Sequence, residues 1–174
     1  MTRCSIYQYH RDMYEIKTLG ADVLREQASD VTEFGPELKR LTSEMFMVMK
    51  RGEGIGLAAP QVGVLKNVFV VQLADGIPRV FVNPEIIETS LEQSPYEEGC
   101  LSVPGIYADV IRPDRVRVQA YTEEGKRFTV DASGLLARVI QHEHDHLKGV
   151  LFVDRLPETK RERVLRMYKK RYRK

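Results

Sequence analysis

LLARVIQHEHDHL, residues 135–147, is the stretch of sequence that decides the fold. Its apolar first half runs directly into a cluster of histidines and acids, and Gly149 follows as a helix stop. Ser133 is placed to cap the start of the helix. A helix this apolar is expected at the centre of the protein, where its polar side chains require partners. The stretch therefore predicts a central helix that carries the chemistry.

The second half of this helix contains the pattern H-E-x-x-H. His142 and His146 are four residues apart, so their imidazoles lie on one helical face about one turn apart and suit a shared divalent metal ion. Glu143 lies roughly 100° round the helix, where it can contact a metal-bound water and take its proton. His144 lies about 200° from His142 and is not expected to be a ligand. A charged helix surface without a metal is the alternative interpretation.

A catalytic metal site of this kind requires a third protein ligand and one open position. Outside the helix, His10 is the one remaining histidine, and the longer pattern H-E-x-x-H-x-x-G-x-x-H is absent. Cys100, which follows a predicted strand within EEGCLS, is a candidate for the third ligand. A lone cysteine also fits a small core residue, so the residues by themselves leave both interpretations open.

The remaining segments predict an α+β fold. An amphipathic helix is expected over residues 36–51, with Pro36 at its first position, and a glycine-rich loop over 52–56. Strands are expected at 68–74, 79–83 and 86–93, a hairpin at 115–121 and 127–132, an extended or irregular segment at 151–156, and a last helix after Pro157. This order predicts antiparallel β-sheets packed around the central helix, plus a C-terminal helix.

Length and composition fit one domain with a tail. A chain of 174 residues, 43% apolar and 30% charged, can bury a core without a disulfide scaffold. These values exclude a disordered chain, a fibrous repeat and a disulfide-rich mini-domain, and no stretch is apolar over the length needed to cross a bilayer. Cys4 and Cys100 are far apart and favour a reducing compartment. Residues 1–12 lack the apolar run of a secretory signal.

Positive charge is concentrated at the C-terminus. The net charge of the chain is +2, but residues 158–174 hold nine basic and two acidic residues, so the remainder is mildly acidic. A basic tail commonly contacts nucleic acid or another anionic surface, and a solvated helix face is the alternative. Val164, Leu165 and Tyr168 could pack the same helix against the body.

Three segments together resemble the peptide deformylase family. GIGLAAPQ (54–61) is similar to the family's motif G-apolar-G-apolar-A-A-x-Q, EGCLS (98–102) to E-G-C-apolar-S, and QHEHDH (141–146) to Q-H-E-apolar-D-H. They come in the family's order and spacing, and the resemblance covers roughly residues 14–156. It departs from the family at His144, where Cys, Met or Leu is usual, and in the N-terminal extension. The implied division is an extension over 1–12, a metallohydrolase domain over 13–157 and a basic helix over 158–174.

The resemblance implies a reaction and a cofactor. The family removes the formyl group from the N-terminal formylmethionine of new polypeptides and releases formate. Cys100, His142 and His146 would bind one divalent metal ion, usually Fe²⁺, which Zn²⁺, Ni²⁺ or Co²⁺ can replace, although the ligand types alone favour zinc. Glu143 would act as base and then as acid. The Gln61 side-chain amide and the Leu101 backbone N–H would stabilise the oxyanion.

The resemblance also implies a peptide-binding cleft. Gly54 and Gly56, which lack a Cβ atom, would let an extended peptide come close. The pocket for the methionine side chain would be formed by Ile55, Leu101, Val139 and the His142 ring, with Glu98 and Tyr107 near its rim. Without the resemblance, Ile55 and Val139 would be interpreted as plain core residues.

Further expectations concern support and partners. The family pairs its aspartate at position 145 with an arginine, which predicts an Asp145–Arg112 ion pair between the metal helix and the cysteine strand; a solvated aspartate is the alternative. The implied partners are nascent formyl-Met polypeptides and, through the basic helix, the ribosome, in the bacterial cytoplasm. No DNA or membrane partner is expected, and oligomerisation is not required.

Two other functions compete with this one. Another H-E-x-x-H metallohydrolase would not explain Gln61, the double-glycine motif or EGCLS. A non-enzymatic ribosome- or RNA-binding module with a structural metal would need four protein ligands, and the sequence offers three good ones.

Overall fold

The computed structural model describes residues 14–172. The extension predicted over residues 1–12, which contains Cys4 and His10, lies outside the described residues. The helices are α1 (Pro36–Arg51), α2 (Gly134–Leu147) and α3 (Glu158–Tyr172), with short 3₁₀ turns η1 (Asp22–Arg25), η2 (Ala59–Val62) and η3 (Phe152–Arg155). The strands are β1 (Gly56–Ala58), β2 (Val68–Gln72), β3 (Pro78–Thr89), β4 (Gln93–Cys100), β5 (Val103–Pro113), β6 (Arg115–Tyr121) and β7 (Arg127–Ser133).

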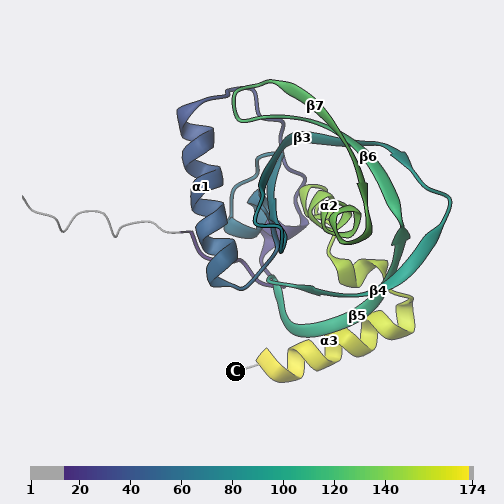
Figure 1. Cartoon of the computed structure of the whole chain (residues 1–174). Coiled ribbons are helices and arrows are strands. Elements are labelled where there is room, and N and C mark those ends of the chain that lie inside the picture. The colour runs from purple at the N-terminus through teal and green to yellow at the C-terminus, as the bar shows by residue number, and fades with distance from the viewer. Residues whose placement is uncertain (1–13, 173–174) are drawn as a thin grey trace, which may run out of the picture.

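Helix α2 lies at the centre of the molecule, between two antiparallel sheets. One sheet has five strands in the order β1-β2-β3-β6-β7, and the other is the β4–β5 pair. Seen end-on in Figure 1, α2 is enclosed by β3, β6 and β7 on one side and by β4 and β5 on the other. The predicted α+β architecture, with antiparallel sheets around the H-E-x-x-H helix and a C-terminal helix, is confirmed.

The five-stranded sheet is buried on both faces over β2. Phe69 and Val71 face α2 and pack with its Val139 and Ile140, whereas Val68 and Val70 face α1. This alternation follows from the two-residue period of a strand. The predicted apolar face of α1, formed by Leu38, Leu41, Met45, Val48 and Met49, is buried against the sheet. Burying side chains of this size stabilises the fold by about 1.5–3 kcal/mol each.

The strands predicted at 79–83 and 86–93 differ from the structure in their bounds: there is no break between them, and residues 90–92 are not in a strand. β3 runs from Pro78 to Thr89 across both predicted strands, with an irregular register between Val82 and Glu85, and β4 begins at Gln93. Asn83 permits the irregularity because it adopts a positive φ of 47° and its side chain exchanges two hydrogen bonds with the Val31 backbone, at 2.8 and 2.9 Å. These long-range contacts leave no local sequence pattern.

Smaller differences lie around the central helix. Ser133 ends β7 and occupies the N-cap position of α2 without a side-chain capping hydrogen bond. The segment expected to be extended or irregular at 151–156 contains the turn η3. Cys100 is the last residue of β4 rather than following a strand.

Helix α3 lies across the outside of the β4–β5 pair (Figure 1). Its Val164 and Tyr168 are buried in a core cluster with Val103, Ile106 and Val110 of β5. The remaining side chains of α3 are mostly exposed. Among residues 14–172, no helix is both long and apolar enough to span a lipid bilayer.

Candidate active site

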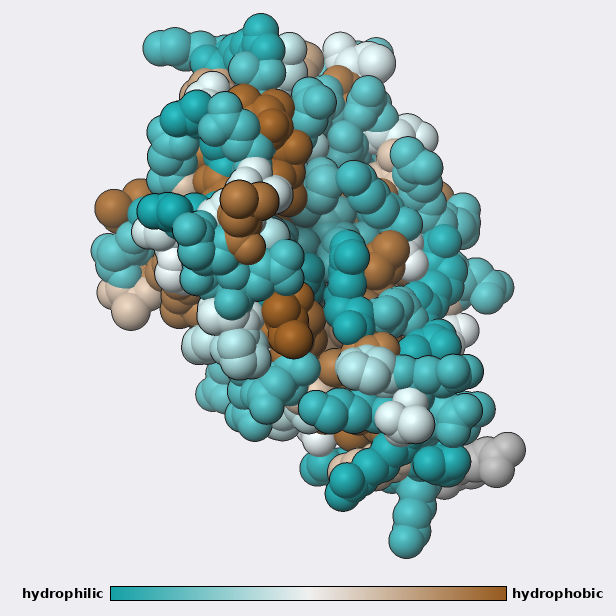
Figure 2. Space-filling view, turned by 90° about the vertical axis from the view of Figure 1, so that its right-hand side faces the viewer, coloured by the Kyte–Doolittle hydropathy of each residue, from teal (hydrophilic) through white to brown (hydrophobic). Residues whose placement is uncertain are grey.

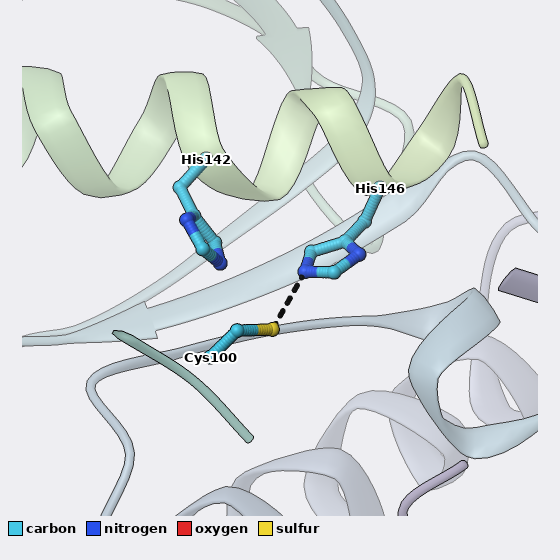
Figure 3. A group of neighbouring side chains, drawn as sticks. All are labelled: Cys100, His142 and His146. Atoms are coloured by element: carbon cyan, nitrogen blue, oxygen red, sulfur yellow. Dashed lines mark hydrogen bonds between the residues drawn. The ribbon is translucent and has the colours of Figure 1, made fainter. Parts of the chain in front are cut away.

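Three potential metal ligands converge between α2 and the end of β4. His142 and His146 extend from one face of α2 toward Cys100, as Figure 3 shows. Their ligand atoms and the Cys100 sulfur all lie within 4.8 Å of one another, and His146 Nε2 is 3.2 Å from Cys100 Sγ. His144 does not take part in this group. The four-residue spacing on α2 therefore brings the two imidazoles together, and the sheet supplies the thiol.

Two of the three ligands, His142 and Cys100, accept or share hydrogen bonds with the surrounding protein, whereas the buried Nδ1 of His146 has no hydrogen-bond partner among the described residues. His142 Nδ1 is 2.9 Å from Glu98 Oε2, which directs its other ring nitrogen toward Cys100. The Ser102 backbone N–H donates to Cys100 Sγ at 3.4 Å. Hydrogen bonds of this kind orient metal ligands before the metal arrives.

The surroundings shift the pKa values of the two histidines in opposite directions. Desolvation and the nearby positive charge of His142 and Arg112 hold the pKa of His146 well below its usual range, so its ring is neutral. Burial alone would lower the pKa of His142, but hydrogen bonds to Cys100 and Glu98 raise it. Metal ions bind the deprotonated forms of thiol and imidazole ligands, so metal binding to this group would depend on pH.

Glu143 is a buried carboxylate beside the ligand group. Burial raises its pKa to about 7, although the positive charge of His142 acts in the opposite direction. Its Oε2 is buried and has no hydrogen-bond partner among the described residues. Gly56 packs so closely that a Cβ atom there would overlap Glu143 Oε1 and lie 2.8 Å from Val139 Cγ1. Only glycine leaves room for this carboxylate.

A cavity of about 540 Å³ opens onto the ligand group. The residues predicted for catalysis and substrate binding line it together: Gly54, Ile55, Gly56, Gln61, Glu98, Leu101, Tyr107, Val139 and Glu143, with Cys100 and His142. Ile55 and Tyr107 are 41% and 66% exposed, whereas Val139 is buried, with 6% of its surface exposed. Ile55 is therefore not the plain core residue of the alternative interpretation.

The Gln61 side chain is fixed in orientation. The Ala58 backbone N–H donates to its Oε1 at 2.8 Å, so its NH₂ group faces Ser102 Oγ at 3.1 Å and Cys100 Sγ at 3.6 Å. Gln61 is almost fully buried but still borders the cavity. Its amide is thus a prepositioned donor beside the ligand group.

Glu98, which the resemblance places near the rim of the methionine pocket, lines the cavity as a buried residue. It is 4% exposed and accepts hydrogen bonds from Arg112 Nε at 2.7 Å and Arg138 Nη1 at 3.2 Å, besides its contact with His142. Burial alone would raise the pKa of Glu98, but the hydrogen bonds from His142 and Arg112 lower it to about 2. Glu98 therefore supports the ligand His142 through the ring nitrogen that does not face Cys100.

The predicted contact between Asp145 and Arg112 is present in this buried network. Arg112 Nη1 lies 2.7 Å from Asp145 Oδ2, and Arg155 pairs with the same carboxylate from the other side. Arg138, which was not among the residues predicted from the sequence, lies on α2 one turn before His142. It also donates to the backbone oxygens of Val110 and Ser94. The sequence signal that could have identified Arg138 is its position as an arginine among the apolar residues of the expected central helix.

The ligand group fits a divalent metal ion. One thiol and two imidazoles are ligands of zinc and related divalent metals, and three protein ligands beside an open cavity are typical of a catalytic rather than a structural site. The unpartnered buried Glu143 Oε2 also indicates that a polar species completes the site.

Comparisons with known proteins agree with this geometry. The family model described as polypeptide deformylase matches residues 13–162. The peptide deformylase of Treponema pallidum is 53% identical over 154 residues, covering 88% of this chain and 94% of that protein. The crystal structure of a peptide deformylase from Legionella pneumophila has a TM-score of 0.87 and 41% identity, covering 92% of this chain and 95% of that chain. A peptide deformylase from Synechococcus elongatus, crystallised in complex with actinonin, has a TM-score of 0.85 and 42% identity, covering 88% and 86%. This chain belongs to the polypeptide deformylase family, whose members remove the formyl group from peptides.

Proposed function

We propose that this chain hydrolyses the formyl amide of N-terminal formylmethionine in a metal-dependent reaction, releasing formate and a free amino terminus. The observation that carries the proposal is the unpartnered buried Glu143 carboxylate, which faces a cavity beside Cys100, His142 and His146. A hydrolase requires a base of this kind at the point where substrate and water meet.

Cys100, His142 and His146 are the residues that would hold the metal, with Fe²⁺ as the expected ion and Zn²⁺, Ni²⁺ or Co²⁺ as replacements. When bound, the ion would supply Lewis acidity to the formyl carbonyl and lower the pKa of water. A structural metal site would need a fourth protein ligand, and the group within residues 14–172 has three.

Glu143 acts twice in the proposed reaction. Its raised pKa, about 7, lets it take a proton from the attacking water near neutral pH and give it up again. It delivers that proton to the amine nitrogen as the bond between that nitrogen and the formyl carbon breaks. The products are then formate and the methionine amine.

Gln61 and Leu101 stabilise the negative charge that develops on the formyl oxygen. The Gln61 NH₂ group is held toward the site because its carbonyl oxygen is engaged by Ala58. Leu101 follows the ligand Cys100 directly and lines the same cavity, and its backbone N–H is the second proposed donor. Donors fixed before the reaction stabilise the transition state without reorganisation.

The substrate lies extended along Gly54–Gly56. Strand β1 is the edge strand of its sheet and pairs with β2 on one side only, so a peptide could add along the other side. Ile55, Leu101 and Val139 would contact the methionine side chain. In the Synechococcus elongatus relative the bound molecule is actinonin, and we propose that actinonin occupies the same cavity here.

The chain is proposed to act in the bacterial cytoplasm, on nascent chains at the ribosome. The basic side chains of α3 are exposed, and the end of the molecule where α3 lies is mostly hydrophilic in Figure 2. Such a surface suits contact with RNA phosphates. The proposed division into an extension at 1–12, a catalytic domain at 13–157 and this helix at 158–174 assigns ribosome binding to α3.

Formate release from a short formyl-Met peptide tests the reaction. Protein loaded with Fe²⁺ or Ni²⁺ without oxygen should release formate, and removal of the metal by a chelator should abolish the release. Adding the ion back to the stripped protein should restore it. Folded, metal-loaded protein that releases no formate would refute the proposal.

A further inference from the structure

The last turn of α3 contacts a wall of the substrate cavity. Pro104, Gly105 and Ile106 line the cavity from β5. From the outside, Arg171 Nη1 donates a hydrogen bond to the Gly105 carbonyl at 3.3 Å, and the Tyr172 hydroxyl donates to the Pro104 carbonyl at 3.2 Å. The helix that carries the basic surface is therefore bonded directly to the substrate site.

Residues 104–106, which form this wall, are not paired with β4 in the two-stranded sheet. β4 pairs with β5 at Gly99↔Tyr107 and next at Cys100↔Val103, so the residues between Val103 and Tyr107 bulge out of the ladder. A bulge disrupts the ladder locally and leaves backbone groups without partners in the sheet. The two carbonyls that this bulge presents outward are those that α3 binds.

The contact is close and is anchored at both ends. A Cβ atom on Gly105, whose φ is +68°, would lie 2.5 Å from Arg171 Nη1, so the guanidinium rests directly on this glycine. The Tyr172 ring packs on the Tyr168 ring with centroids 4.8 Å apart. Tyr168 is 8% exposed and belongs to the core cluster that contains Ile106. The last turn is thus joined to the body on one side and to the bulge on the other.

We propose that Arg171 and Tyr172 are positioning residues for substrate: they hold the 104–106 bulge in the place where it closes the cavity. The inference rests on the proposed function, because the cavity is that of the deformylation site. Loss of the two contacts weakens peptide binding and leaves the chemical step unchanged, since neither residue reaches Glu143 or the ligand group.

Steady-state hydrolysis of a formyl-Met tripeptide tests this. Arg171→Ala combined with Tyr172→Phe should raise KM about three- to tenfold, as expected for two lost hydrogen bonds, with kcat within about twofold of wild type. Arg171→Lys with Tyr172 intact should restore most of the affinity. Arg166→Ala is the matched control, because Arg166 lies on the same helix and pairs with Glu162. It removes the same charge without touching the bulge and should leave KM unchanged.

A second readout does not depend on activity. Backbone amide hydrogen exchange over 103–107 should become faster in the double variant and not in Arg166→Ala. An unchanged KM in the folded double variant, or an equal rise in KM in the control, overturns the proposal. If wild-type protein releases no formate, the proposed function fails instead. In that case the amide exchange rates over residues 103–107 test the positioning role by themselves. Exchange that is unchanged in the double variant overturns this role.

Discussion

At the scale of single residues, Glu98 determines how the ligand group is held. Its buried carboxylate faces His142, Arg112 and Arg138, and its pKa, lowered to about 2, keeps it charged. An ionised acceptor fixes the tautomer and the orientation of the His142 ring. Glu98 lies within EGCLS, two positions before the ligand Cys100. The same short motif therefore supplies one ligand and the residue that orients another, His142.

Replacing Glu98 should weaken metal binding. Glu98→Gln keeps the shape but replaces the ionised acceptor of His142 with a neutral amide oxygen, so metal affinity should fall about 10- to 100-fold. Competition with a chromophoric chelator measures the affinity. Glu97→Gln, an exposed neighbour on the same strand, is the control and should bind as wild type does. An unchanged affinity in Glu98→Gln would show that Glu98 does not orient the ligand.

Individual residues could be predicted to different degrees. The spacing of His142 and His146 fixed one face of a helix, so their convergence followed from geometry. Cys100 could be assigned only through the resemblance, because a lone cysteine carries no spacing. The burial of Glu98 and Arg138 could not be predicted, since each is explained by partners far away in the sequence.

At the scale of elements, η3 joins the central helix to α3, and Asp154 fixes it. The Leu151 backbone N–H donates to Asp154 Oδ2 at 2.9 Å, and Arg25 of η1 and Arg161 of α3 both pair with the same carboxylate. Burial alone would raise the pKa of Asp154, but the hydrogen bonds from Arg25 and Leu151 lower it below its usual range.

The lowered pKa predicts a pH-dependent contribution to stability. A carboxylate whose pKa is lower in the folded state stabilises the fold above its ordinary pKa, and this contribution is lost as the pH falls. Asp154→Asn should therefore reduce the free energy of unfolding by about 1 kcal/mol at neutral pH and by much less near about pH 3. Urea unfolding at both pH values measures this change in the free energy of unfolding. Exposed Asp109→Asn is the control, and a difference that persists equally in acid would contradict the explanation.

The helices were better predicted than the strands for a physical reason. The helical period places Leu38, Leu41, Met45, Val48 and Met49 on one side of α1 by local spacing alone. β4 and β5 were not predicted although they form a hairpin, because β4 is mostly exposed and its sequence QSPYEEGC lacks the alternation of apolar and polar residues that indicates a strand. The irregularity at Asn83 likewise depends on Val31, about fifty residues away.

At the scale of the whole molecule, the charge is divided between two regions. The C-terminal seventeen residues are strongly basic, and the rest of the chain is mildly acidic. Val164 and Tyr168 bury one side of α3 against β5, which confirms the predicted packing of this helix on the body. The basic side chains are exposed, and two of them, Arg161 and Arg171, also contact the body through Asp154 and the Gly105 carbonyl.

Reversing charge on α3 should weaken binding to ribosomes. Lys169→Glu combined with Lys170→Glu should lower the affinity about tenfold or more at ~0.1 M salt and reduce the slope of log affinity against log salt by about two. Co-sedimentation across a salt series measures both. Lys50→Glu with Lys66→Glu makes the same charge change on exposed residues of the body and serves as control. Equal effects of the two pairs would contradict a specific role for α3.

The measurement that tests the central claim most directly combines formate release with metal content in Glu143→Gln. The amide keeps the shape of the side chain but cannot carry the proton, and neither Cys100, His142 nor His146 is altered. We predict that the variant retains one divalent ion per chain and loses kcat by about 10²- to 10⁴-fold. A variant that keeps its metal and still releases formate at the wild-type rate would contradict the account.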